Sequence, residues 1–158
     1  MIAFRKVKIH DASFIHKLMM AKDYEDIFYE KDTSIEEWEH RIESLKRERG
    51  TDNYMIYDSE QNQKVGWIMY EVEDGVCFLH LIVIDYKELG KKYGYHSLQK
   101  LVYELQDKSV KRILLDVQKS NFGAIDFYKR FGFAIIGSEN QIVNNIKTQE
   151  YLKMEYVL

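Results

Sequence analysis

The sequence predicts an α/β fold of the α+β kind, in which a mixed, mostly antiparallel sheet of six to seven strands carries helices on both faces. Three observations favour it. Asp74-Gly75 is a strong two-residue hairpin signal between two strand patterns. Apolar residues alternate with polar ones near both ends of the chain, at 2–9 and 149–157. In the second half, helical patterns directly follow apolar strand patterns, as in β-α-β crossovers.

The first half of the chain predicts one strand, two helices and then three more strands. Asp11 stands where a helix N-cap is expected, ahead of an apolar helical face. Thr33-x-x-Glu36 is a capping-box signature that opens a second helix. The strands expected here are 2–9, 54–57, 65–72 and 76–84.

The second half predicts two strand-to-helix units and a closing pair of strands. A helix runs to about Asp107, and another begins at Asn121 and ends at Gly132. The strands expected here are 112–117, 133–136 and 149–157. The order is therefore β-α-α-β-β-β-α-β-α-β-β. Because neither a linker nor a repeat interrupts it, we expect one domain over 1–158.

Composition limits the classes of partner. The chain has 158 residues, a net charge of −3 and one cysteine, Cys77. A slightly acidic chain without a basic tail is not expected to bind nucleic acid or anionic membranes. A single cysteine gives no internal disulfide, and the first residues do not resemble a signal peptide, so the cytoplasm is the expected location. A homodimer is one assembly to consider.

Residues 81–95 form the stretch around which the rest is organised. An apolar run that ends at Ile84 is followed by a short loop with Gly90 and Gly94, and then by a helical pattern. The first N–H groups of a helix have no intrahelical partner and carry partial positive charge, so this arrangement suits a phosphate group. Lys91 and Lys92 add formal positive charge. An ordinary strand-to-helix connection is equally compatible with the spacing.

A second stretch, Leu115-Asp116-Val117-Gln118-Lys119-Ser120-Asn121 followed by Ala124-x-x-x-Tyr128-x-x-x-Gly132-Phe133, favours the phosphate interpretation. Together the two stretches resemble motifs A and B of the Gcn5-related N-acetyltransferases (GNAT), a family of acetyl-CoA-dependent enzymes. The second stretch is most similar to the ribosomal-protein N-terminal acetyltransferase branch. The resemblance is specific over about 80–134. It implies the GNAT fold, in which the fourth and fifth strands separate and receive the pantetheine arm of the cofactor.

The resemblance also implies a set of cofactor-binding residues. The family pattern Gln/Arg-x-x-Gly-x-Gly/Ala falls on Leu89, Lys92 and Gly94, so only its last glycine is intact. Backbone N–H groups can still bind a pyrophosphate, whereas a side chain at Lys92 either moves the loop outward or pairs with a phosphate. The residues expected to contact acetyl-CoA are Ile82, Val83, Ile84, Leu89, Gly90, Lys91, Lys92, Tyr93, Gly94, Tyr95, Asn121 and Tyr128. No metal is expected.

Two catalytic residues follow from the same resemblance. Tyr128 matches the tyrosine that acts as general acid toward the cofactor sulfur, although a core aromatic is the structural alternative. Asp116 matches the acidic position of the resembling branch and is the expected base, directly or through water. A solvated residue at a sheet edge or groove is its alternative. His80 is the second candidate base, with a core histidine as its alternative.

The expected function is acetyl-CoA-dependent transfer of an acetyl group to a primary amine, in a ternary complex. A small cationic amine, a peptide N-terminus and a lysine are all open as acceptors. The segment 23–32 contains five carboxylates, one lysine and three aromatic residues, and in this fold it lines the acceptor side of the cleft. A solvated acidic loop is its alternative. The rival function is a non-catalytic acyl-CoA-binding or regulatory domain on the same fold.

Overall fold

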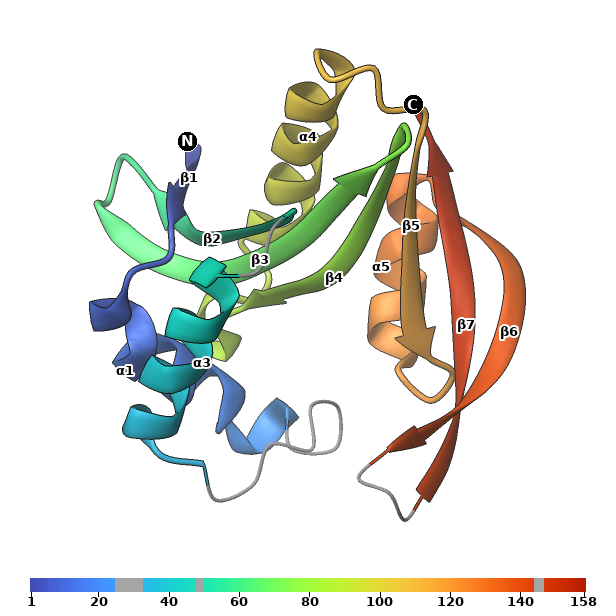
Figure 1. Ribbon diagram of the computed structural model, residues 1–158. Coiled ribbons are helices and arrows are strands. Elements are labelled where there is room, and N and C mark those ends of the chain that lie inside the picture. Colours follow the sequence, from blue (N-terminus) through green and yellow to red (C-terminus); the bar gives the residue numbers. More distant parts are fainter. Residues whose placement is uncertain (25–32, 48–49, 144–146) are drawn as a thin grey trace.

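The computed structural model describes residues 1–24, 33–47, 50–143 and 147–158, and its central feature is a seven-stranded sheet (Figure 1). The strand order across the sheet is β1-β2-β3-β4-β5-β7-β6. Only the β4–β5 neighbours are parallel. The strands are β1 (Ile2–Lys6), β2 (Thr51–Asp58), β3 (Gln63–Glu73), β4 (Val76–Ile84), β5 (Arg112–Gln118), β6 (Ala134–Val143) and β7 (Lys147–Val157). This confirms the predicted mixed, mostly antiparallel sheet.

Helices cover both faces of the sheet, as predicted (Figure 1). The described helices are α1 (Ala12–Met19), α3 (Ile35–Arg47), α4 (Tyr93–Gln106) and α5 (Phe122–Phe131), with short 3-10 turns at Ile9–Asp11, Lys22–Tyr24 and Tyr86–Glu88. One buried cluster joins α1 and α3 to Met55, Trp67 and Val83 of the sheet. The other joins α4 and α5 to sheet residues that include Ile68 and Ile113. The sheet is thus the middle of three layers.

The predicted caps of the first two helices are only partly right. Asp11 precedes α1, but its carboxylate accepts from the Lys8 N–H (2.8 Å) and pairs with Lys64 instead of capping the helix. The capping box of α3 lies one residue later than predicted, at Ser34 and Glu37. The register moved because the Thr33 hydroxyl accepts from the Trp38 indole N–H at 3.1 Å, which removes it from the cap.

The turn predictions are confirmed. Asp74 and Gly75 both have positive φ, 49° and 77°, as a two-residue hairpin between β3 and β4 requires. Gly132 ends α5 at φ 124°, and its N–H donates to the carbonyls of Tyr128 and Lys129. The Asn121 side chain accepts from the Ala124 N–H at 3.2 Å and caps α5.

Strands β4 and β5 pair over a short length and then separate. Val76, Cys77 and Phe78 are in register with 112–114, and beyond Leu114 no register pair joins these two fully described strands. A bulge follows at once in β4, because Tyr70 pairs with Leu79 and Met69 with Leu81, which leaves His80 as the extra residue. A bulge bends its strand and increases the local twist. The ends of β4 and β5 therefore diverge (Figure 1).

Candidate active site

A cavity of about 900 Å³ lies where β4 and β5 diverge. Its walls come from the end of β4, the loop that follows, the start of α4 and one side of α5. The lining residues are Tyr24, Ile82, Val83, Ile84, Glu88, Leu89, Gly90, Lys92, Tyr93, Gly94, Tyr95, His96, Asn121, Gly123, Ala124, Phe127, Tyr128 and Arg130. Apart from Lys91, every residue predicted to contact the cofactor lines this cavity.

The end of β4 presents backbone hydrogen-bonding groups to the opening. The Asp85 N–H donates to the Val65 carbonyl at 2.8 Å and so points toward β3. In a strand, the N–H and C=O of one residue point to the same side, and those of the next residue point to the opposite side. The N–H and C=O of Ile82 and Ile84 therefore point away from β3, toward β5. The Tyr24 hydroxyl donates to the Ile84 carbonyl at 2.7 Å, in agreement with that direction. An extended amide chain in the opening would therefore meet backbone donors and acceptors.

The loop after β4 reaches α4 through two residues with positive φ, Gly90 (84°) and Lys92 (63°). Lys92 occupies the N-cap position of α4 in a left-handed conformation and makes no side-chain cap. The first turn of α4 contains no acidic residue, so its N–H groups and partial positive charge are available to an anion. A Cβ on Gly94 would lie 3.3 Å from the Phe127 ring, so glycine keeps α4 close to α5.

Lys91 and Lys92 differ in what they contact. The Lys91 ammonium lies 2.6 Å from the Glu88 carboxylate, and Lys91 does not line the cavity. The Glu88 carboxylate also accepts from the Gln63 amide at 2.9 Å. The hydrogen bond from Lys91, followed by that from Gln63, lowers the pKa of Glu88 and keeps it ionised at neutral pH. Lys92 is exposed and lines the cavity, so it is the lysine of this loop that can face a phosphate.

Tyr128 lies on α5 with its ring buried and its side chain on the cavity wall. It packs against Phe127 and Phe133 with ring centroids 5.3 and 5.4 Å away. Burial raises the pKa of its hydroxyl above the ordinary tyrosine value, so the phenol stays protonated at neutral pH. A protonated phenol can donate a hydrogen bond or a proton into the cavity. Asn121 also lines the cavity while it caps α5.

Neither candidate base lines the cavity. Asp116 is exposed, opposite Lys153 of β7, and its strand neighbours Leu115 and Val117 are buried in the cluster of α4 and α5. Its side chain therefore points to the face of the sheet opposite α5. His80 is exposed too, and its ring lies 3.2 Å from the Glu71 carboxylate. The structure thus brings Tyr128 and the loop 85–92 to one cavity, and it leaves Asp116 on the opposite face of the sheet.

The cavity also contains residues that the sequence did not single out. Glu88, His96 and Arg130 line it, and Arg130 pairs with Asp126 one helical turn away (3.2 Å). Of the predicted acceptor segment 23–32, residues 25–32 lie outside the described part of the chain.

The beginning of that segment lies at the cavity. Tyr24 is one of the lining residues and packs edge to face against Tyr86, with ring centroids 6.3 Å apart. Burial, followed by the carboxylates of Asp85 and Asp23, raises the pKa of Tyr24 to about 12. The two carboxylates therefore give negative potential to this side of the cavity, where a cation would be attracted.

Comparison with known proteins fits this geometry. The family model described as "Acetyltransferase (GNAT) family" matches residues 17–133, about three quarters of the chain. The chain belongs to the GNAT acetyltransferase family. Membership supports N-acetyltransferase activity, and the separated strands, the glycine loop and α5 of this chain lie within the matched region.

Individual relatives are distant. The uncharacterized protein YxbD of Bacillus subtilis is 28% identical over 100 residues, which are 63% of this chain and 60% of that protein. The spermidine N-acetyltransferase from Vibrio cholerae, solved with CoA and spermine, has a TM-score of 0.81 at 19% identity and covers 99% and 95% of the two chains. The ribosomal-protein-S18-alanine N-acetyltransferase from Escherichia coli has a TM-score of 0.72 at 17% identity, over 99% and 94%. These structures confirm the GNAT fold.

Two features are absent from the described residues. Within 1–24, 33–47, 50–143 and 147–158, no group of three or more His, Cys, Asp or Glu side chains is placed to hold a metal ion. In the same ranges, none of the helices is both long enough and apolar enough to cross a membrane.

Lys92 provides a test of the loop conformation. A left-handed conformation costs a residue with a Cβ about 1–2 kcal/mol, and glycine relieves that cost. Part of the relief is offset because glycine has greater conformational freedom in the unfolded chain. Lys92→Gly should therefore raise the free energy of unfolding by about 0.5–1 kcal/mol in urea denaturation. Lys92→Ala is the matched control, since it removes the charge and keeps the strain. Equal free energies of unfolding for Lys92→Gly and Lys92→Ala would contradict the left-handed conformation assigned to Lys92.

Proposed function

We propose that this chain transfers the acetyl group of acetyl-CoA to a primary amine, by direct attack within a ternary complex. The observation that carries the proposal is the cavity at the divergence of β4 and β5, with the uncapped start of α4 at its edge. An opening through the sheet lets a thioester be reached from both faces. The proposal includes no acetyl-Cys77 intermediate. Cys77 is fully buried, and burial raises the pKa of its thiol to about 12, so the thiolate that would attack the thioester is not formed at neutral pH.

The donor is held mainly by backbone groups in this proposal. The pyrophosphate of CoA binds the N–H groups of the loop and of the first turn of α4, with Lys92 as the nearby cation. The pantetheine amides pair with the outward peptide groups of Ile82 and Ile84, as an added strand would. The N–H and C=O of Val83 face β3, where Val83 pairs with Trp67, so Val83 contributes to the cavity wall and not to the pairing of the amides, and its side chain packs toward α1 and α3. A β4 N–H can also stabilise the oxyanion that forms on the thioester carbonyl.

Acid and base act from opposite faces of the sheet. Tyr128, on the α5 side, donates to the sulfur as the C–S bond breaks. Asp116, on the other side, takes a proton from the incoming ammonium, and an ordered water bridges the distance because the side chain is short and exposed. The amine must lose a proton since its ordinary pKa is about 10.4. His80 remains the alternative base on the same face.

The acceptor is proposed to be cationic. Asp23 and Asp85 lie close enough to raise the pKa of Tyr24, so negative potential and an aromatic face meet at one side of the cavity. Cations are attracted by both. The two named structural relatives are, by their names, a spermidine N-acetyltransferase and a ribosomal-protein-S18-alanine N-acetyltransferase. A small cationic amine and a peptide N-terminus both remain in the proposal as acceptors. We also propose a cytoplasmic location, with Cys77 as a free thiol, and a homodimer as one assembly to test.

The activity itself is tested by release of free thiol from acetyl-CoA in the presence of an amine panel. Polyamines and basic peptides should be better acceptors than neutral amino acids, and their KM should rise with salt, which screens the attraction. Binding of CoA without turnover on any amine would favour the rival, a non-catalytic acyl-CoA-binding domain. Failure to bind CoA would exclude both functions.

Tyr128→Phe tests the general acid. Removal of one hydroxyl should lower kcat by about 10²–10⁴-fold, the usual worth of acid catalysis, with acetyl-CoA binding nearly unchanged. Phe127→Leu is a matched control, since it changes the neighbouring lining ring without removing a proton donor. A kcat within a factor of two of the wild type would assign Tyr128 to packing alone.

Asp116→Asn tests the base. Its rate defect should grow as pH falls, because more of the amine is then protonated and needs a base. His80→Gln is the parallel variant, and its defect should be independent of pH if Asp116 is the base. A pH-independent defect of Asp116→Asn, together with a pH-dependent defect of His80→Gln, would transfer the role to His80.

A further inference from the structure

The loop between β4 and α4, residues 85–92, is the phosphate loop of the proposed function. Two buried carboxylates connect it and the start of α4 to the turn between β2 and β3. Asp58, at the end of β2, is 6% exposed, and Glu88, in the loop itself, is 9% exposed. Both lie near the site proposed for a pyrophosphate, where free negative charge would oppose binding. Buried carboxylates must be well hydrogen-bonded to be tolerated. Their partners therefore show what these groups do.

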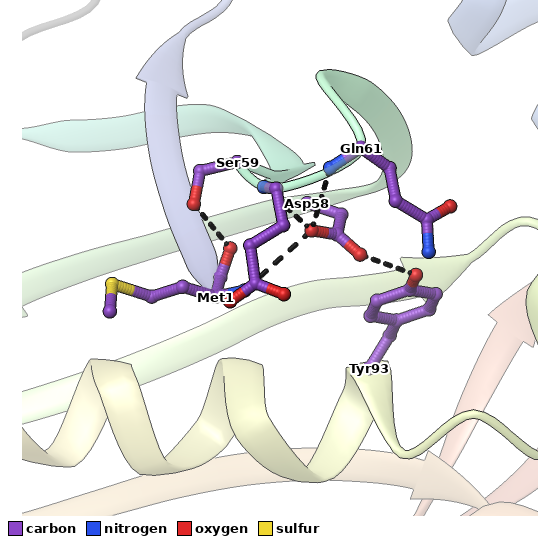
Figure 2. Close-up of polar contacts among 6 residues, drawn as sticks. Met1, Asp58, Ser59, Gln61 and Tyr93 are labelled. Atoms are coloured by element: carbon purple, nitrogen blue, oxygen red, sulfur yellow. Dashed lines mark hydrogen bonds and ion pairs between the residues drawn. The ribbon is translucent and has the colours of Figure 1, made fainter.

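Asp58 accepts from several donors at once (Figure 2). The Tyr93 hydroxyl donates to one oxygen at 2.7 Å, and the N–H groups of Glu60 and Gln61 donate to the other at 3.0 and 3.3 Å. The amino group of Met1 lies 3.6 Å from the same oxygen. The hydrogen bond from Tyr93 is the largest cause that lowers the pKa of Asp58. Asp58 is thus an ionised and fully engaged acceptor.

Tyr93 connects this acceptor to the anion site. It is the first residue of α4, so its backbone N–H belongs to the turn that faces the cavity, while its hydroxyl reaches the turn between β2 and β3. Its ring also lines a second cavity of about 440 Å³ with Ile2, His96 and Lys100. The ring itself is buried in the cluster of α4 and α5, so the hydroxyl contact links a packed residue of α4 to the β2–β3 turn.

The second connection joins the same turn to the same loop. Gln63, the first residue of β3, donates to Glu88 at 2.9 Å, and Lys91 neutralises that carboxylate at 2.6 Å. Between Glu88 and Tyr93 the backbone takes positive φ at Gly90 and Lys92, so local preferences do not hold the loop in its shape. Two contacts from the β2–β3 turn, one at each end of the loop, supply that constraint.

We propose that the turn Asp58–Gln63 positions the cofactor-binding loop, with Asp58 acting through Tyr93 and Gln63 acting through Glu88. This rests on the proposed function, because the affected ligand is CoA. The two contacts keep the N–H groups of the first turn of α4 aimed into the cavity before CoA arrives. Preorganisation of this kind raises affinity by lowering the ordering cost of binding.

Tyr93→Phe, which deletes only the hydroxyl, is the first test. The Kd for CoA, measured by isothermal titration calorimetry, should rise about 10-fold, in the lower part of the range for losing a hydrogen bond to an ionised group. In steady-state assays the KM for acetyl-CoA should rise with it, and the KM for the amine should not. Tyr54→Phe is the matched control, since Tyr54 donates to Asp52 at 3.0 Å and does not line the cavity.

Both tyrosine variants should lose thermal stability, but only Tyr93→Phe should lose affinity. Equal Kd values for Tyr93→Phe and the wild type would overturn the inference and leave the proposed function intact. Absence of CoA binding by the wild type would instead defeat the proposed function. Gln63→Leu repeats the test at the other contact if Tyr93→Phe does not fold. Its control is Gln61→Leu, since only the backbone of Gln61 contacts Asp58.

Discussion

The loss of pairing between β4 and β5 is the constraint on which the site depends. Three register pairs join the strands, and the bulge at His80 then turns β4 away. After the bulge, Leu81 and Val83 pack toward α1 and α3, whereas Ile82 and Ile84 pack toward α4 and α5. The peptide groups of Ile82 and Ile84 are thereby left facing a gap. An unpaired strand edge is normally a liability, and here it borders the cavity of about 900 Å³.

Around that gap, polar groups are divided between the two faces. Tyr128 is buried on the α5 side, and Asp116 is solvated on the opposite side. In the proposed anion site, backbone N–H groups contribute more than formal charge, since Glu88 neutralises Lys91. This explains how a chain with a net charge of −3 can offer a site for phosphate without a basic patch. The positive charge at the proposed site is local, because it comes from the N–H groups at the start of α4.

Much of the fold and the cavity could be predicted from the sequence, because alternation, glycine turns and helix caps are local signals. Asp74-Gly75 and Asn121 behave as their chemistry requires. What failed depends on side-chain contacts that the local patterns do not specify: Lys64, far along the chain, pairs with Asp11, and the Trp38 indole donates to the Thr33 hydroxyl five residues away. Likewise, the orientation of Asp116 follows from which face of β5 is buried, and apolar neighbours on both sides of Asp116 within 113–117 do not reveal that.

The position of the cavity also has a consequence for how the chain folds. Tight turns connect β2, β3 and β4, and β6 and β7 pair with each other, so these strands can pair with neighbours in the sequence. The β4–β5 pairing instead closes a long connection through α4, as the β1–β2 pairing closes one through α1 and α3, and each carries a larger entropic cost. The seam between β4 and β5 is therefore expected to assemble after the β2–β3–β4 and β6–β7 pairs. A chain with one half folded would have much of its secondary structure and no binding site.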